Sequence, residues 1–389
     1  MQKNLLIMNK TVDTFIALLR SAITGTNESI DLKDADFEAL YALSSFHDLA
    51  HVAYYELNKR IEQWQGETYC KFKQKYDMSL YRCIRRDLAI EQVKKTLENA
   101  EIPFVLLKGA CLMRLYPETW MRTSSDIDVL VEPQNHKKAI AVLEASGFEL
   151  FTESSHDVSF FSPDKYHVEL HHSLVEEGRL PKTAKLLKQV WQYTAPIEER
   201  FERTLNDEMF NLYHFAHMAK HLKEGGCGVR YFIDLWLLDH RTHFDPAKRE
   251  LLIRKSGLLS FADESEKLTE KWFSAENCKE NLSVLEEFIL RGGIYGSLEQ
   301  SVVVRKNKVR GRFSYYIVRI FPTYNMIKYS YPVLRFCPLL LPFCWVIRWF
   351  KLLSAKTRKR ALNEIKVETA TDDEDVARVN QLMKQLRIE

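Results

Sequence analysis

Two aspartates stand one residue apart inside a run of apolar residues, in the stretch SSDIDVLVEP. Ile, Val and Leu at this density predict a buried β-strand. Successive side chains of a strand point to opposite faces, so Asp126 and Asp128 share one face, and Ile127, Val129 and Val131 share the other. Two like charges at this spacing repel each other, and burying them without a partner is costly. The stretch therefore predicts either a cation beside the aspartates or a face that is open to solvent.

The hydrophobic period divides the chain into four parts. Apolar residues at three- and four-residue spacing predict an N-terminal helical domain in residues 1–100. Short apolar runs separated by turn residues then predict a strand, helix, strand, helix, strand and hairpin in residues 101–176, which together form a small α/β unit. Helical spacing returns in residues 177–300, and residues 301–389 hold a basic apolar segment and a mixed acidic tail.

A third carboxylate follows on a later strand of the α/β unit. In the stretch HVELHH, alternation places Glu169 on one face with His167 and His171. If this strand lies beside the aspartate strand, Glu169 stands next to Asp126 and Asp128. Three carboxylates on neighbouring strands suit Mg²⁺ or Mn²⁺, because these cations take oxygen ligands. The alternative is a strand edge whose carboxylates face water.

Three stretches of this region together resemble a known family. VLLKGACLMRLYP, MRTSSDIDVLV and HVELHHSL are similar to the nucleotidyltransferase superfamily of DNA polymerase β type, and within it to the family called NTP_transf_5. The resemblance extends over residues 35–350 and is clearest over 103–174. It implies an α+β fold, with a small mixed β-sheet nucleotidyltransferase core flanked by N- and C-terminal helical regions.

The resemblance also implies an activity and assigns roles to the carboxylates. The enzyme would move a nucleoside monophosphate from an NTP, expected to be ATP, to an acceptor hydroxyl or phosphate and release pyrophosphate. Asp126 and Asp128 would ligate the metal, and Glu169 would be the third ligand or the base that takes a proton from the acceptor. The acceptor is either a small molecule or a peptide or protein, and the sequence does not identify it.

Five residues are implied to bind the nucleotide: Lys108, Gly109, Arg122, Ser124 and Ser125. Gly109 would let the backbone approach the triphosphate at a helix N-terminus, where free N–H groups favour anions. The superfamily usually has Gly-Ser or Gly-Gly where this chain has Gly-Ala, which leaves backbone amides and Lys108 to meet the phosphates. Arg122 would offset charge on the phosphates. Ordinary surface or salt-bridge roles are the alternative for Lys108 and Arg122.

A later helix carries a stripe of histidines, in NLYHFAHMAKHLKEGGCGVRYFID. In the resembling family, two histidines followed by Arg and Asp occupy this place, which implies an accessory role for His217, His221, Arg230 and Asp234 near the nucleotide site. Zinc held by His217, His221 and Asp234 is one alternative. Another is a set of histidines packed against the next helix and bonded to Asp234. Contact of His217, His221 and Arg230 with the substrate's phosphate or base is the third.

The basic apolar segment suits a surface role. Residues 301–360 hold 14 Lys or Arg and no Asp or Glu, in a chain whose net charge is +3. Its uninterrupted apolar run, from Phe336 to Ile347, has 12 residues, against about 20 for a spanning helix. Residues 331–360 therefore suit an anionic membrane interface, with core packing or an acidic partner as the alternative. Nucleic acid is not favoured, because the sequence contains no groove-reading module.

The remaining expectations concern the compartment and the class of protein. With 46% hydrophobic residues the chain can bury a sizeable core, which excludes an intrinsically disordered protein. The seven scattered cysteines predict free thiols, and the N-terminus resembles no signal peptide, so we expect a cytoplasmic protein, in part membrane-peripheral. The alternative to an enzyme is a catalytically silent nucleotide-binding protein or membrane-associated scaffold in a biosynthetic assembly. The oligomeric state is not indicated.

Overall fold

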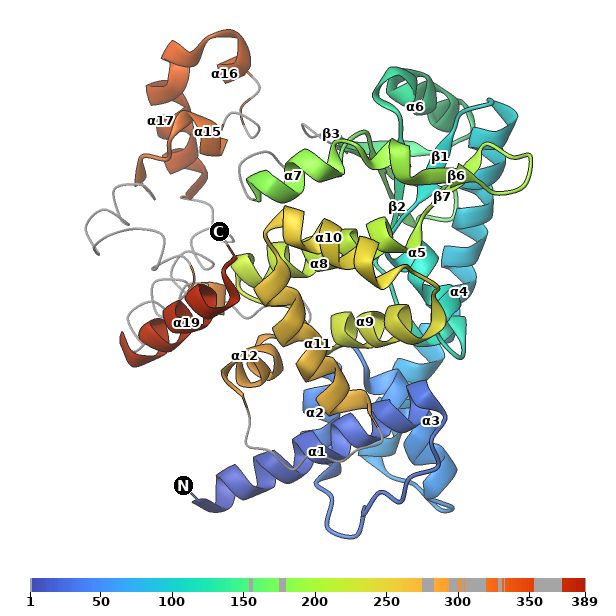
Figure 1. Cartoon of the computed structure of the whole chain (residues 1–389), viewed down its shortest axis with the longest axis vertical. Coiled ribbons are helices and arrows are strands. Elements are labelled where there is room, and N and C mark those ends of the chain that lie inside the picture. Colours follow the sequence, from blue (N-terminus) through green and yellow to red (C-terminus); the bar gives the residue numbers. More distant parts are fainter. Residues whose placement is uncertain are drawn as a thin grey trace. The chain divides into compact units, whose positions relative to one another are not determined.

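The computed structural model describes most of the chain and divides it into two compact units (Figure 1). The described residues are 2–153, 157–174, 180–274, 283–293, 300, 301, 304, 320–327, 331, 333–352 and 373–388. The first unit consists of Met1–Ala219, Gly228–Asn281 and Arg387–Glu389, and the second of Lys220–Cys227 and Leu282–Leu386. Each unit is described by itself below.

A seven-stranded mixed sheet is the centre of the first unit. Its strands are β1 (Phe104–Leu106), β2 (Asp126–Val131), β3 (Glu149–Glu153), β4 (Asp157–Phe161), β5 (His167–His171), β6 (Thr194–Pro196) and β7 (Glu202–Leu205). They lie in the order β3-β4-β5-β2-β1-β7-β6. β2 pairs with β5, and β1 with β7, in parallel, whereas the other neighbours are antiparallel. The aspartate strand β2 is therefore the central strand of the sheet.

Helices α4 (Glu67–Asn99) and α6 (His136–Ala145) pack on the sheet. Ile127, Val129 and Val131 are fully buried and join one hydrophobic core with Val93 of α4 and Leu143 of α6. Alternation along β2 then directs Asp126 and Asp128 to the opposite face. The predicted division of β2 into an apolar face and an acidic face is therefore confirmed.

Further helices surround the sheet in the first unit. They are α1 (Gln2–Thr24), α2 (Phe37–Phe46), α3 (Ala50–Arg60), α5 (Gly109–Leu112), α7 (Pro181–Leu187), α8 (Asp207–Glu224), α9 (Val229–Arg241), α10 (Pro246–Ser256) and α11 (Leu259–Phe273), with short 3₁₀ turns at Met113–Leu115, Thr119–Met121, Pro133–Asn135 and Val190–Tyr193. The last five residues of α8 belong to the second unit. The helical N-terminal region and the α+β class match the prediction.

One part of the sheet differs from the prediction. Residues 177–300 were expected to be helical, but strands β6 and β7 lie within them and extend the sheet beyond residue 176. The two strands have three and four residues and form an antiparallel edge hairpin. Strands this short carry too few residues to display a two-residue period, and Pro196 is tolerated because the strand is at the edge.

The second unit contains α12 (Val284–Gly292), α15 (Tyr324–Ile327), α16 (Val333–Phe336), a 3₁₀ turn at Pro338–Leu340, α17 (Leu341–Leu352) and α19 (Asp373–Leu386). Pro338 is the first residue of its turn and Pro342 lies in the first turn of α17. Both prolines therefore lie at the start of helical segments, where a missing backbone N–H costs nothing, and the apolar run from Phe336 to Ile347 is divided between α16, the 3₁₀ turn and α17. The basic run TRKR lies outside the described residues.

α17 leaves an apolar stripe exposed. Phe336 and Leu339, which precede it, are 89% and 86% exposed, and Phe343 and Phe350 within it are each 68% exposed. Trp345 anchors the other side of the helix, since its Nε1 donates to the carbonyl of Pro322 at 2.8 Å. A search of the described helices for one long and apolar enough to cross a bilayer finds none.

The cysteines in the described part of the chain are free thiols, as predicted; they are Cys70, Cys83, Cys111, Cys227, Cys337 and Cys344. Cys278 lies outside that part.

Candidate functional site

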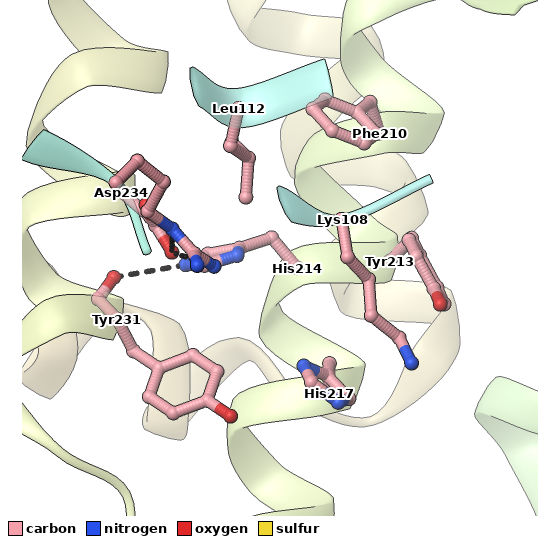
Figure 2. A pocket seen from close by; sticks show the side chains of 9 residues that line it. Lys108, Leu112, Phe210, Tyr213, His214, His217, Tyr231 and Asp234 are labelled. Carbon is pink, nitrogen blue, oxygen red and sulfur yellow. Dashed lines mark hydrogen bonds and ion pairs between the residues drawn. The ribbon is translucent and has the colours of Figure 1, made fainter. Parts of the chain in front are cut away.

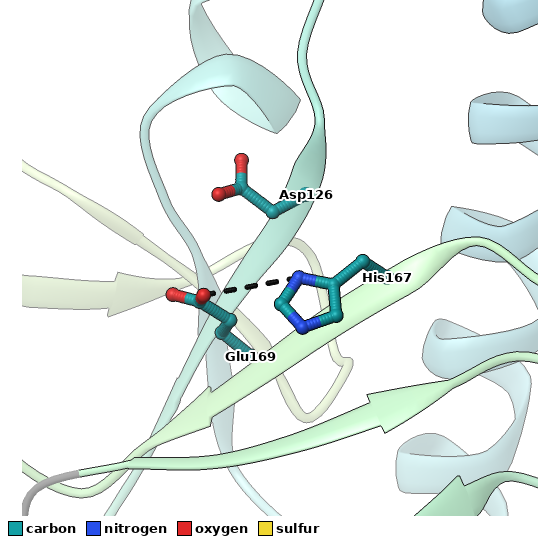
Figure 3. A group of neighbouring side chains, drawn as sticks. All are labelled: Asp126, His167 and Glu169. Carbon is teal, nitrogen blue, oxygen red and sulfur yellow. Dashed lines mark ion pairs between the residues drawn. The ribbon is translucent and has the colours of Figure 1, made fainter. Parts of the chain in front are cut away.

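The pairing of β2 with β5 gathers the acidic residues on one face of the sheet. The two strands run parallel, with Asp126 beside His167, Asp128 beside Glu169 and Leu130 beside His171. Because each strand alternates, the side chains of Asp126, Asp128, His167, Glu169 and His171 project to the same face. Figure 3 shows Asp126, His167 and Glu169 turned toward one another. The structure thus brings the three predicted carboxylates together and adds two imidazoles to them.

The donor atoms of these five residues form two overlapping groups. Asp126, His167 and Glu169 make one, and Asp128, Glu169 and His171 make the other. Within each group the ligand atoms lie within 4.8 Å of one another. Carboxylate oxygens and imidazole nitrogens are ordinary ligands of divalent cations, so this donor set fits such an ion. Glu169 belongs to both groups and lies where two ions would share a ligand.

Asp128 is the most deeply buried member of the cluster. Its side chain is 2% exposed, and its Oδ1 lies 2.6 Å from Nζ of Lys108 and 2.8 Å from Nε2 of His171. Burial acts to raise the pKa of Asp128, but Lys108 and His171 outweigh burial and hold this pKa well below its usual range. Burial and the neighbouring charge of Asp128 raise the pKa of Asp126. Lys108 thus supplies one positive charge beside the aspartates, and the divalent ion stays a prediction.

Lys108 occupies an unusual backbone position. Its φ of 44° lies in the left-handed region, which non-glycine residues rarely adopt. Burial acts to lower the pKa of Lys108, yet Asp128 raises it well above its usual value, so the side chain stays charged. This conformation places Lys108 at the N-cap of α5, a helix of only four residues. The phosphate contact expected of Lys108 stays a prediction.

Gly109 lies against the segment that leads into β2. A Cβ on Gly109 would meet Oγ of Ser124 at 2.8 Å and Cβ of Ser124 at 3.0 Å. Ser124 in turn donates its hydroxyl to Oδ1 of Asp126 at 3.0 Å. The glycine is thus needed for a close approach that positions the first aspartate. Ser125, also predicted to bind nucleotide, is exposed beside it.

Arg122 is held by Asp234. Its Nε and Nη2 donate to the two carboxylate oxygens at 2.8 Å and 3.0 Å, and Tyr116 donates its hydroxyl to Oδ1 at 2.7 Å. All three side chains are buried. Burial and the Asp234 charge raise the pKa of Tyr116 well above its usual value, so it remains a neutral donor. The structure therefore places Arg122 in an internal ion pair, which was the alternative to contact with phosphate.

Four successive backbone carbonyls, of residues 121–124, accept hydrogen bonds from side chains of distant elements. His51 Nε2 contacts the first at 3.0 Å, Arg86 the second at 2.7 Å, Arg230 the third at 3.1 Å and the Tyr166 hydroxyl the fourth at 2.7 Å. We call this set the carbonyl clamp. Sequence reasoning found only Arg230, because a buried His or Arg on an N-terminal helix has no local pattern that marks its partner.

The histidine helix α8 lines a pocket next to Lys108. Figure 2 shows Lys108, Tyr213 and His217 around the same space. The residues that line it are Lys108, Leu112, Arg122, Phe210, Tyr213, His214, His217, Tyr231 and Asp234. An ammonium group and aromatic rings thus border one hollow, and both can contact a nucleotide.

The predicted accessory residues do not act together as a zinc site. Among the described residues, the groups whose ligand atoms converge do not include His217, His221 and Asp234. Both carboxylate oxygens of Asp234 accept from Arg122. The packing alternative is closer to the structure, because the rings of His214 and His217 both pack on Tyr231 of α9. Nε2 of His214 contacts the carbonyl of Tyr231 at 2.9 Å rather than Asp234.

Comparison with known proteins gives one family and one solved structure. A family model described as an uncharacterised nucleotidyltransferase matches residues 33–274. The antibiotic-resistance factor ANT(2'')-Ia, a solution structure, is 14% identical with a TM-score of 0.32, and the match covers 46% of this chain and 93% of that one. No curated protein matches the chain.

Proposed function

This chain belongs to the family of uncharacterised nucleotidyltransferases, and on that premise we propose that it moves a nucleoside monophosphate from an NTP to an acceptor and releases pyrophosphate. The observation that carries the proposal is the pairing of Asp128 with Glu169 on parallel strands, two residues after Asp126. Three carboxylates on one face, at the centre of a sheet with an apolar back, are costly to keep unless they bind a cation.

The proposed roles follow from the positions of the side chains. Asp126, Asp128 and Glu169 would hold Mg²⁺ or Mn²⁺, which supplies positive charge to the transferring phosphoryl group. Glu169, which is less buried than Asp128, is either a ligand or the base that accepts a proton from the attacking acceptor group. No role is needed for a covalent intermediate on the protein, because in-line attack requires only positioning and charge.

The nucleotide would lie between the Gly109 turn and helix α8. Lys108 lines the pocket on α8 and contacts Asp128, so its flexible side chain can exchange the carboxylate for a phosphate oxygen. Gly109, Ser124 and Ser125 would meet the phosphates. Tyr213 and His217 offer ring faces to the base, and ring stacking accepts any base, so ATP remains an expectation from the family resemblance.

A labelling experiment tests this function while the acceptor is still unidentified. Each of the four NTPs, labelled at the α-phosphate, is incubated with the purified protein, Mg²⁺ or Mn²⁺ and a cell extract, and transfer of label to any protein, peptide or metabolite is followed by mass spectrometry. We expect transfer with the wild type and none with Asp126→Asn. Glu149→Gln is the matched control, because Glu149 is an exposed acidic residue of the same sheet, outside the cluster. Equal labelling by wild type and Asp126→Asn would refute an enzymatic role for the carboxylates.

The second candidate is a catalytically silent nucleotide-binding or scaffold protein. It predicts that labelled NTP binds in the presence of metal and that the label is never transferred. One observation favours this candidate: the ion pair of Lys108 with Asp128 neutralises the Asp128 charge without any metal. The same labelling experiment, with bound and transferred label counted separately, distinguishes the two candidates.

We also propose that the second unit binds an anionic membrane surface through residues 331–360. Exposed Phe343, Ile347 and Phe350 recur at helical spacing on α17. Phe336 and Leu339 are exposed in the two short elements before it, and residues 301–360 contain no acidic residue. An apolar stripe with flanking cations suits a helix lying in the headgroup region.

Flotation on liposomes tests this membrane proposal. We expect the protein to float with vesicles that contain anionic lipid, and Phe343→Asp to remain at the bottom. Leu88→Asp is the control, because Leu88 is an exposed apolar residue of α4 in the first unit. A wild type that stays at the bottom with both anionic and neutral vesicles would exclude membrane binding.

A further inference from the structure

The cluster on β2 and β5 contains two imidazoles that a magnesium site does not need. His167 and His171 belong to the two groups of converging donor atoms. They come from alternate positions of β5, so the strand directs both toward the aspartates together with Glu169. A site built for Mg²⁺ alone usually takes one or two carboxylates and keeps water on the remaining positions.

His171 is hydrogen-bonded to Asp128, in a position from which its Nε2 could also bind an ion. Its Nε2 lies 2.8 Å from Oδ1 of Asp128 and 3.5 Å from Oε2 of Glu169. Neighbouring ligands of a six-coordinate ion, each about 2.1 Å from the metal, lie about 3 Å apart. Nε2 of His171 therefore lies at close to a ligand–ligand separation from each carboxylate, and the donor atoms of the three residues are all within 4.8 Å of one another. The side chains of Asp128 and His171 are 2% and 10% exposed, so this group is largely shielded from solvent.

His167 repeats the arrangement less closely. Its Nδ1 lies 3.8 Å from Oε1 of Glu169, and its side chain is half-buried against the ring of Phe161. The two carboxylate oxygens of Glu169 thus face different imidazoles. A nitrogen ligand is available on each side of the shared glutamate.

We propose that the divalent ion held by Asp128 and Glu169 also takes Nε2 of His171 as a ligand, and that the site therefore prefers Mn²⁺ to Mg²⁺. Imidazole nitrogen binds first-row transition metals more strongly than it binds Mg²⁺, which retains oxygen ligands. His167 offers the same kind of ligand to a second ion beside Asp126. This inference rests on the proposed function for the presence of an ion, and it adds the identity of the ion and a nitrogen ligand beside the carboxylates.

An ion bound by Asp128 would have to displace the Lys108 ammonium from this carboxylate. The ammonium contacts the same Oδ1 of Asp128 that His171 contacts. An ion at this position brings its own positive charge, so the lysine side chain is released from Asp128.

Electron paramagnetic resonance of the full chain with Mn²⁺ alone tests the proposal directly. Electron spin echo modulation detects ¹⁴N bonded to Mn²⁺, and we expect this coupling in the wild type and its loss in His171→Gln. The matched control is His172→Gln. His172 is the next residue on the chain, and its ring packs on His136 at 4.6 Å between centroids instead of on the carboxylates.

Affinities for the two metals separate a ligand from a residue that only orients Asp128. We expect His171→Gln to weaken Mn²⁺ binding at least about tenfold and Mg²⁺ binding by less than about threefold. Equal weakening of both metals would assign His171 to orienting Asp128 and overturn the proposal. The proposal would also be overturned if the wild type bound no Mn²⁺, or bound Mn²⁺ without nitrogen coupling. It would likewise be overturned if only His167→Gln removed the coupling.

The outcome is independent of catalysis. Nitrogen coupling without any transfer of label would leave the metal assignment standing and refute the proposed function. Transfer of label without nitrogen coupling would do the reverse. The wild-type spectrum needs no substituted protein, so a variant that failed to fold would not prevent the test.

Discussion

The buried ion pair between Arg122 and Asp234 allows the most demanding prediction. Asp234 is fully buried and Arg122 is 5% exposed, and two hydrogen bonds of 2.8 Å and 3.0 Å join them. Removing one member of such a pair leaves the other charge buried without compensation, which costs about 3–5 kcal/mol of unfolding free energy. We expect a loss of this size for Arg122→Met, and for Asp234→Leu, which also leaves the Tyr116 hydroxyl without its acceptor.

The double variant is the informative one. Arg122→Met with Asp234→Leu removes both charges and fills the space with apolar groups, which is often close to neutral for a buried pair. We therefore expect the double variant to be no less stable than the less stable of the two single variants, which requires a coupling energy of at least about 3 kcal/mol, the size of the smaller single loss. The Tyr116 hydroxyl has no acceptor in the double variant either, so the double variant still loses about 1–3 kcal/mol of unfolding free energy.

Urea denaturation followed by tryptophan fluorescence measures these losses, with free energies from linear extrapolation. Arg122→Lys is a further comparison, because lysine keeps the charge and loses the two-pronged contact; it should lie between the wild type and Arg122→Met. Single-variant losses below about 1 kcal/mol, or losses that simply add in the double variant, would refute the conclusion that Arg122 serves chiefly as the partner of Asp234.

Three further predictions follow from single contacts. Gly109→Ala should lower nucleotide transfer, measured as label transferred per minute, because the new Cβ meets Ser124 at 2.8 Å and moves the hydroxyl that Asp126 accepts. Burial lowers the folded-state pKa of His214, so below about pH 6.5 the unfolded state binds more protons than the folded state. The free energy of unfolding should therefore decrease as the pH is lowered, by at most about 1.4 kcal/mol per pH unit from this group. Urea midpoints measured from about pH 7 down to about pH 5 should decrease less steeply for His214→Gln. Burial raises the pKa of Cys111 to about 12, so iodoacetamide at pH 8 should label exposed Cys70 and spare Cys111, as peptide mass spectrometry would report.

The sequence predicted the aspartate strand well because its signal is local. Alternation alone assigned Asp126 and Asp128 to one face and Ile127 to the other, and the structure has that division. The same reasoning placed Glu169 on a later strand, but only the order of strands in the sheet makes β5 a neighbour of β2. Strand order depends on how the whole chain packs, which no short stretch of sequence contains.

The partners of the charged residues could not be predicted for the same reason. Lys108 and Arg122 lie in stretches that resemble phosphate-binding segments, whereas in the structure they contact Asp128 and Asp234, which are 20 and 112 residues away along the chain. Likewise β7 joins the sheet through its long-range pairing with β1, and β6 and β7 are each too short to show a period. Local pattern predicted the elements, and tertiary packing determined which charges meet.

The carbonyl clamp bears on whether the nucleotidyltransferase core is a portable module. The segment that enters β2 is held by His51 of α3 and Arg86 of α4, from the N-terminal helices, and by Arg230 of α9, from beyond the last strand. A chain cut to residues 101–176 would keep both aspartates and Glu169, yet the carbonyls of Met121 and Arg122 would lose their donors and the carbonyl of Thr123 would keep only Arg122. Recombination or truncation at the predicted domain boundaries should therefore destroy the site while sparing every residue that forms it. Inheritance of this site requires the flanking helices to be inherited with it.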